Sequence, residues 1–254
     1  MRYTDLVFDL YGTLVDIHTE ENDLVWEKTA LYFGFYGAPY TAQTLKADFQ
    51  AALKAREAKA GQSYECFPDI PFESVMAELF RKQGIGDADR LGINAAQLFR
   101  ICSFEYLRLY PKVKVTLRRL RRLGCRLWLL SNAQQIFSAY ELRQLGLGEE
   151  FDGVYISSDY GFRKPDGRFF GALLREQKLD AKRCLMIGND RDTDIAGARA
   201  AGLATLYMHT ELTPREQQAA DPNRNTDGHW EFEGDDWEKL YDLIASIVQY
   251  PKEN

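Results

Sequence analysis

The fold is decided by Leu6-Val7-Phe8-Asp9-Leu10-Tyr11-Gly12-Thr13-Leu14-Val15-Asp16, near the start of the chain. Its first three residues are apolar and predict a short buried strand, which a turn at Gly12 follows. Asp9 therefore stands at the carboxyl end of a buried strand. Ligands of open α/β sheets bind at that edge. Asp9 is a candidate functional residue, with a helix-cap or turn role as the structural alternative.

Composition narrows the class of protein. The chain has 254 residues, 45% of them hydrophobic and 28% charged, and a formal net charge of −6. These values are typical of a soluble globular protein with one large or two moderate domains. The acidic balance argues against nucleic acid or an anionic membrane as a general partner, since both require a basic face. With no signal region and no long apolar run, we expect a cytoplasmic protein.

Residues 17 to 110 show helical periodicity and no strand signal. Apolar side chains recur at helical spacing in four segments, broken by glycine and proline. These segments predict helices at 22–36, 41–60, 72–80 and 94–109.

From Pro111 onward, strand and helix patterns alternate. A helix at 112–122 has a basic outer face, which we interpret as a solvated surface because no aromatic residues interleave with it. The polar segment 210–234 predicts a surface loop. The remaining pattern predicts strands at 126–130, 153–158, 184–187 and 204–208, and helices at 135–145, 168–176, 193–201 and 237–248.

This alternation predicts βαβ units and a doubly wound parallel sheet, the α/β class. The sheet domain is discontinuous: residues 1–16 supply its first strand and residues 111–254 the rest. An all-helical cap of residues 17–110 is inserted directly after the strand that carries Asp9. Such an insert would lie over the carboxyl edge of the sheet like a lid.

Polar residues follow four of the predicted strands. Because the carboxyl ends of parallel strands share one edge, these groups converge, and four converging clusters indicate a site. The clusters are Asp9 with Thr13, Ser131 with Asn132, Lys164 in the third loop, and Asn189, Asp190 and Asp194. Asp192 is predicted to cap the helix that follows.

The order and spacing of these motifs resemble the haloacid dehalogenase-like (HAD) hydrolase superfamily, and the insert resembles its helical C1 cap. The resemblance covers nearly the whole chain. It implies a phosphohydrolase in which the Asp9 carboxylate attacks phosphorus and forms an aspartyl-phosphate. It also implies Mg²⁺, held by Asp9, the carbonyl of Tyr11, and Asp190 or Asp194.

The remaining roles fit a small phosphorylated substrate. Lys164 supplies positive charge between nucleophile and substrate. Hydrogen bonds to the phosphoryl oxygens are expected from Ser131 and Asn132, and Thr13 either positions the phosphate or closes the first turn.

Tyr11 departs from the family pattern. Most phosphatases of the superfamily carry a second aspartate at this position, two residues after the nucleophile, where it serves as general acid and base. A phenol with a pKa near 10 is a poor base at neutral pH. Phosphatase turnover is therefore expected to be weak unless another group substitutes.

Two alternatives follow from this departure. An Asp-x-Tyr opening resembles the 2-haloacid dehalogenase branch, in which the aspartate attacks carbon and needs no metal. A binding or regulatory protein on the same scaffold, with little turnover, is the third hypothesis. The acidic fourth motif favours the metal-dependent phosphohydrolase, because crowded carboxylates disfavour an ionised nucleophile without a cation.

Overall fold

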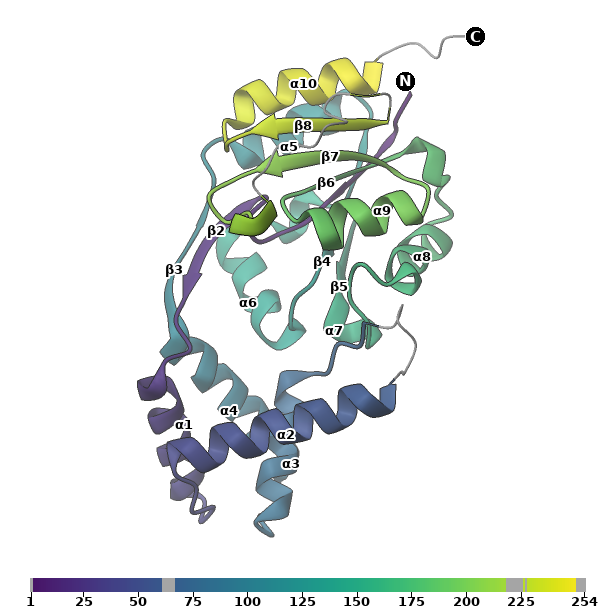
Figure 1. The fold of residues 1–254 in the computed structure, drawn as a ribbon. Helices are drawn as coiled ribbons and strands as arrows, with labels where there is room; N and C mark the ends of the chain where they lie inside the picture. The colour runs from purple at the N-terminus through teal and green to yellow at the C-terminus, as the bar shows by residue number, and fades with distance from the viewer. Residues whose placement is uncertain (1, 61–66, 218–225, 227, 250–254) are drawn as a thin grey trace.

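A parallel β-sheet organises the molecule. The computed structural model describes residues 2–60, 67–217, 226 and 228–249. Within these residues, a six-stranded parallel sheet has the order β5-β4-β1-β6-β7-β8 (Figure 1). Its strands are β1 (Asp5–Phe8), β4 (Arg126–Ser131), β5 (Gly153–Ile156), β6 (Cys184–Gly188), β7 (Ala204–His209) and β8 (His229–Glu233).

The first strand, β1, lies in the interior of this sheet. It pairs with β4 on one side and β6 on the other, so the strand order reverses at β1. A crevice forms at such a reversal, outside the carboxyl ends of the strands. Asp9 directly follows β1, and the fold therefore places it at this switch point.

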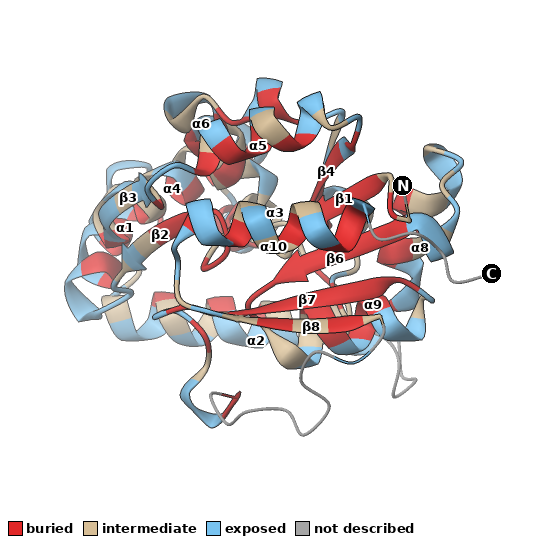
Figure 2. Ribbon diagram, turned by 90° about the horizontal axis from the view of Figure 1, so that it is seen from above, coloured by how far each residue is buried: buried red, intermediate tan, exposed pale blue. Residues whose placement is uncertain are grey.

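Both faces of the sheet are covered by helices, and the α/β prediction is confirmed. Leu6 and Phe8 of β1 point to one apolar cluster, and Val7 points to the other. The first cluster includes side chains of α5 and α10, and the second includes side chains of α8 and α9. Figure 2 shows buried strands with helices on either side. These helices are α5 (Val113–Arg122), α10 (Trp237–Gln249), α8 (Gly167–Glu176) and α9 (Ala196–Ala200).

Two further helical elements begin after strands β4 and β5, at the carboxyl edge of the sheet. Helix α6 (Gln135–Leu145) follows β4, and the single turn α7 (Ser157–Tyr160) follows β5. The predicted strand at 153–158 was therefore too long, because Ser157 and Ser158 turn into α7. No helix among the described residues is long and apolar enough to cross a membrane.

Four helices of the insert pack on one another around an apolar cluster of their own. Trp26, Phe33 and Phe80 lie within it, and the Phe33 and Phe80 rings stack with centroids 3.8 Å apart. Figure 1 shows these helices gathered on one side of the sheet. They are α1 (Asp23–Phe35), α2 (Ala42–Ala60), α3 (Phe72–Lys82) and α4 (Ala88–Ser103).

The prediction that residues 17–110 are entirely helical was wrong. Residues Val15–Thr19 (β2) and Phe104–Leu109 (β3) form an antiparallel two-stranded ribbon that joins the insert to the sheet (Figure 1). Helix α4 ends at Ser103, where Phe104 takes an extended backbone. Apolar residues at Phe104 and Leu107 imitate helical spacing, and only pairing with the distant β2 reveals the strand.

The prediction of a loop across 210–234 was also wrong at its end. Residues His229–Glu233 form β8, which pairs in parallel with β7. The strand alternates Trp230 and Phe232, which pack on the core, with polar residues on the other face. The strand has only five residues, two of them glutamates, so its sequence does not show a clear strand pattern. Residues 218–225 and 227 of this segment lie outside the described residues.

The basic outer face of α5 is engaged in ion pairs. Arg118 pairs with Glu150 at 2.6 Å, and Arg121 pairs with Asp152 at 3.1 Å. The guanidinium of Arg119 lies 3.5 Å from the centre of the Tyr241 ring. These contacts connect α5 to the residues before β5 and to α10, so the basic residues have a structural role.

The close packing of α3 on α4 gives a first prediction. A Cβ added at Gly92 would lie 2.5 Å from the carbonyl oxygen of Glu73 and 2.7 Å from the Cβ of Ala77. Relieving this clash requires a shift of the α3 backbone, which costs free energy. We therefore expect Gly92→Ala to lower the free energy of unfolding by about 1–3 kcal/mol. Urea denaturation followed by circular dichroism measures this change.

Gly86→Ala is the matched control. No heavy atom lies within 4 Å of a Cβ built there. Its free energy of unfolding should stay within about 0.5 kcal/mol of the parent protein. Equal effects of the two substitutions would contradict the packing constraint at Gly92.

Candidate active site

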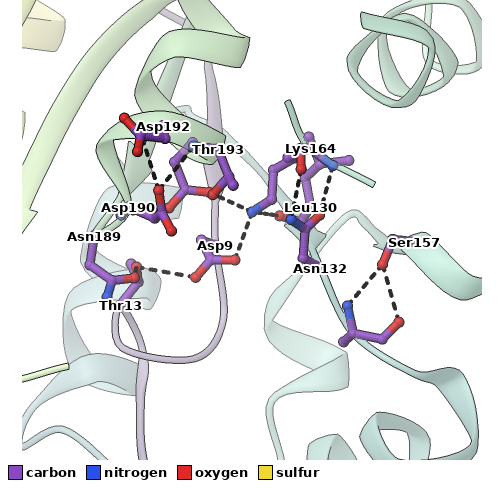
Figure 3. A network of polar contacts seen from close by, with 12 residues as sticks. Asp9, Thr13, Leu130, Asn132, Ser157, Lys164, Asn189, Asp190, Asp192 and Thr193 are labelled. Atoms are coloured by element: carbon purple, nitrogen blue, oxygen red, sulfur yellow. Dashed lines mark hydrogen bonds and ion pairs between the residues drawn. The ribbon is translucent and has the colours of Figure 1, made fainter. Parts of the chain in front are cut away.

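The ammonium group of Lys164 is the centre of the polar cluster at the carboxyl edge of the sheet. Its Nζ donates to Asp9 Oδ1 at 2.7 Å, to Asp194 Oδ1 at 2.6 Å and to the carbonyl of Leu130 at 2.8 Å. Figure 3 shows the Lys164 side chain extending to Asp9 from a different segment of the chain. The Lys164 side chain is only 1% exposed. Since an ammonium has three protons, every donor of Lys164 is used.

The charges in this cluster do not balance. Burial lowers the pKa of Lys164, but the carboxylates of Asp194 and Asp9 outweigh burial and raise it, so the lysine stays charged. Burial raises the pKa of Asp194, Lys164 lowers it, and the nearby Asp9 raises it again, leaving it above its usual range. One ammonium thus serves two buried carboxylates.

The second oxygen of Asp9 faces Thr13 and Asn189. The Thr13 hydroxyl lies 3.2 Å from Asn189 Oδ1 and 3.5 Å from Asp9 Oδ2. Gly12 has φ +80°, and a Cβ there would collide with the Asn189 amide. Glycine is the residue that tolerates this conformation. The tight turn therefore places Thr13 beside the nucleophile candidate.

Asp190, not Asp192, caps the helical turn Arg191–Ile195, which corrects the sequence prediction. Its Oδ1 accepts hydrogen bonds from the backbone N–H groups of Asp192 and Thr193, both at 2.9 Å. Asp194 Oδ2 accepts from the N–H of Asp190 at 3.1 Å. Asp192 is exposed and accepts from Gln217 at 3.1 Å.

Asn132 and Ser131 play different parts at the end of β4. The Asn132 amide binds the backbone of Lys164 twice, accepting at 2.7 Å and donating at 3.0 Å, and so positions the lysine (Figure 3). Ser131 is fully buried, and its hydroxyl has no hydrogen-bond partner among the described residues. A buried hydroxyl without a hydrogen-bond partner is energetically costly, which makes Ser131 a candidate for contact with a ligand.

Tyr11 turns its side chain towards helix α6. Its hydroxyl donates to Glu141 Oε2, and Glu141 Oε1 accepts from Arg100 Nε at 2.7 Å. Burial raises the pKa of Tyr11 well above its ordinary value, and Glu141 adds to the rise. Tyr11 therefore carries its proton as a donor to Glu141. Sequence reasoning missed Glu141 and Arg100, because neither lies near a motif along the chain.

The insert docks on the core at a second point, on the far side of the cluster. Asp69 accepts hydrogen bonds from Gln134 at 2.6 Å and from the hydroxyl of Ser157. The N–H of Phe72 donates to the side-chain oxygen Oε1 of Gln134 at 2.7 Å. The start of α3 and the segment before it are thus bound to the N-cap residue of α6 and the first residue of α7.

The structure therefore brings together most of the residues that the sequence singled out. Direct side-chain hydrogen bonds link Asp9, Thr13, Asn189, Lys164 and Asp194. Asn132 binds the backbone of Lys164, and the N–H of Asp190 binds Asp194. A fixed carboxylate beside a buried ammonium is suited to nucleophilic attack or to cation binding.

A family comparison agrees with this arrangement. The model of the haloacid dehalogenase-like hydrolases matches residues 6–202, and the chain belongs to this family. The match covers all four motifs. The chain is accordingly a member of a hydrolase family.

Curated relatives carry phosphatase names. A glyceraldehyde 3-phosphate phosphatase from Methanothermobacter thermautotrophicus is 36% identical over 120 residues, which are 47% of this chain and 53% of the relative. The chain thus spans about half the length of this relative. A phosphoglycolate phosphatase from Mesorhizobium japonicum is 27% identical over 222 residues, covering 86% of this chain and 88% of the relative.

Solved structures confirm the fold. A 2-haloacid dehalogenase from Pseudomonas syringae superposes with a TM-score of 0.65 at 22% identity, covering 96% of this chain and 98% of that one. A HAD phosphatase from Thermococcus onnurineus gives a TM-score of 0.54 at 17% identity, covering 96% and 98%. A dehalogenase and a phosphatase thus share this fold, and the fold alone does not distinguish between the two activities.

The ion cluster gives a second prediction. Lys164→Met leaves Asp9 and Asp194 buried together without a cation, and removing one member of a buried ion pair typically costs about 3–5 kcal/mol. We expect a loss of this size in the free energy of unfolding, measured in chelator. Adding Asp194→Asn should recover part of it. If the double substitution is as unstable as the sum of the two singles, the charge imbalance is not its cause.

Proposed function

We propose that the chain is a Mg²⁺-dependent phosphohydrolase of a small phosphorylated metabolite, with Asp9 as the nucleophile. The observation that carries the proposal is the pair of contacts around Asp9 at the switch point of the sheet: Lys164 holds one carboxylate oxygen, and the other faces Thr13. The phosphatase names of the relatives support phosphorus rather than carbon as the target of attack.

The donor set suits a hard divalent cation. Asp9, Asp190 and Asp194 bring three carboxylates to one edge, against a single ammonium, and Mg²⁺ prefers oxygen ligands. We propose Asp9, the Tyr11 carbonyl and Asp190 as ligands. Asp194, whose two oxygens already accept from Lys164 and Asp190, would orient the set. When bound, the cation neutralises charge on the phosphoryl group.

The chain's own residues then account for each step. The Asp9 carboxylate attacks phosphorus, the new O–P bond forms, and the bond to the ester oxygen breaks; that oxygen takes a proton from solvent. Water then attacks the aspartyl-phosphate and regenerates Asp9 with release of phosphate. Lys164 donates to Asp9 and balances incoming negative charge. The Ser131 hydroxyl, which has no hydrogen-bond partner within the described residues, donates to a phosphoryl oxygen.

Residues 17–110 act in this proposal as a cap, and residues 1–16 with 111–254 as the catalytic core. The contacts of Asp69 with Gln134 and of Arg100 with Glu141 support this role, because they tie the insert to the core at two points. A docked cap excludes water from the site and strengthens its electrostatic interactions. A cap over the site also restricts the substrate to a small molecule.

The chemistry gives a third prediction. Hydrolysis of p-nitrophenyl phosphate should require both Asp9 and Mg²⁺, because this ester has a leaving group that needs little protonation. We expect Asp9→Asn to lower kcat by at least about 10³-fold, in keeping with losses seen on removal of nucleophiles. Chelator should abolish the activity of the wild-type protein, and Mg²⁺ should restore it.

Two results would contradict this proposal. Halide release from a 2-haloacid in chelator, dependent on Asp9, would establish the dehalogenase. Binding of Mg²⁺ and a phosphate analogue without turnover of any ester would establish a binding protein.

The metal ligands give a fourth prediction. Asp190→Asn keeps the side-chain oxygen that caps the helical turn but removes the charge, so it should raise the Mg²⁺ concentration for half-maximal activity about tenfold or more. Asp192→Asn is the matched control, since Asp192 is exposed and binds only Gln217 among the contacts seen for its side chain within the described residues. Equal Mg²⁺ requirements in the two variants would exclude Asp190 as a ligand. The tenfold figure is about 1.4 kcal/mol of binding free energy.

A further inference from the structure

Arg100 lies on α4 of the insert, and its side chain contacts the core. Only some of the hydrogen-bond donors of its guanidinium have a partner within the described residues. Its Nε donates to Glu141 Oε1 at 2.7 Å, and its Cζ lies 5.2 Å from the centre of the Phe137 ring. Neither of its two terminal Nη groups donates a hydrogen bond within the described part of the chain. The side chain is only 19% exposed. A guanidinium so enclosed ordinarily uses its terminal groups.

Two other arginines of the insert, Arg56 and Arg90, do not combine an enclosed side chain with unused terminal donors. Arg56 uses Nε and both Nη groups, on Glu78 and Ser74, and therefore has a structural role within the insert. Arg90 also pairs through Nε alone, with Asp87, but lies 59% exposed on the outer surface. Arg100 alone among these three combines enclosure with unused terminal donors.

Glu141 connects Arg100 to the nucleophile loop. The same carboxylate accepts from the hydroxyl of Tyr11, two residues after Asp9. Glu141 is nearly fully buried and therefore rigid. Glu141 holds the Nε edge of Arg100, and the guanidinium lies over the Phe137 ring, so the guanidinium is held at the carboxylate that also binds the Tyr11 hydroxyl. The planar Nη fork of a guanidinium matches a carboxylate or phosphate in a bidentate manner.

We propose that the terminal fork of Arg100 recognises a second anionic group on the substrate, distant from the phosphoryl group that Asp9 attacks. This inference rests on the proposed phosphohydrolase function and narrows its substrate class to phosphate monoesters that also carry a carboxylate or a second phosphate. Glu141 acts as a positioning residue, because it orients Arg100 without contacting substrate.

Competition against p-nitrophenyl phosphate hydrolysis tests the proposal. The two competitors are 2-phosphoglycolate and ethyl phosphate, which are similar in size and differ in the carboxylate. The wild-type protein should bind the first more tightly, by about 100-fold if the carboxylate makes two charge-assisted hydrogen bonds. Arg100→Met should reduce that ratio at least about tenfold, with Arg100→Lys between the two because it keeps the charge and loses the fork.

Arg56→Met is the matched control and should leave the ratio unchanged. Equal inhibition by the two competitors in the wild-type protein would overturn the proposal without any variant, and so would an unaltered ratio in folded Arg100→Met. Failure of the wild-type protein to hydrolyse p-nitrophenyl phosphate is a different result: it contradicts the proposed phosphohydrolase function on which the inference rests.

Discussion

The buried contact of Lys164 with Asp9 and Asp194 is the interaction on which the rest of the site depends. It joins the loops after β1, β5 and β6, and through the Leu130 carbonyl it also reaches β4. These loops are far apart in sequence, and only a parallel sheet with a reversal of strand order at β1 gathers them. The same contact makes one ammonium serve two buried carboxylates, and burial together with the nearby Asp9 raises the pKa of Asp194 above its usual range. A second cation at this edge would relieve the excess of carboxylates.

Much of this was predictable from local sequence, for definite reasons. The run Leu6–Phe8 before Asp9 predicts a buried strand with an acid at its end, and the shared direction of parallel strands then brings Lys164 and Asp194 to the same edge. The strands β2, β3 and β8 were missed because each is short and stabilised by a distant partner strand. The link from Tyr11 through Glu141 to Arg100 was missed because side-chain contacts between separate helices leave no periodic signal.

The insert and the core are linked by two separate polar contacts. Asp69 of the insert binds Gln134 and Ser157, and Arg100 of the insert binds Glu141. Both contacts end on α6 or on the turn next to it, and α6 begins just after Ser131 and Asn132. Movement of the insert would therefore shift α6 and the neighbouring residues that position Lys164. The proposed substrate-binding residue Arg100 and the nucleophile Asp9 thus depend on the same elements of the core.

The proposed reaction depends on attack of the Asp9 carboxylate on phosphorus. To detect the intermediate, the protein is mixed with Mg²⁺ and a phosphate ester, quenched in acid on the millisecond scale, and the mass of the peptide that contains Asp9 is measured. We expect a transient increase by one phosphoryl group on Asp9, absent in chelator. Release of phosphate with no modified Asp9 peptide at any quench time would contradict attack by Asp9.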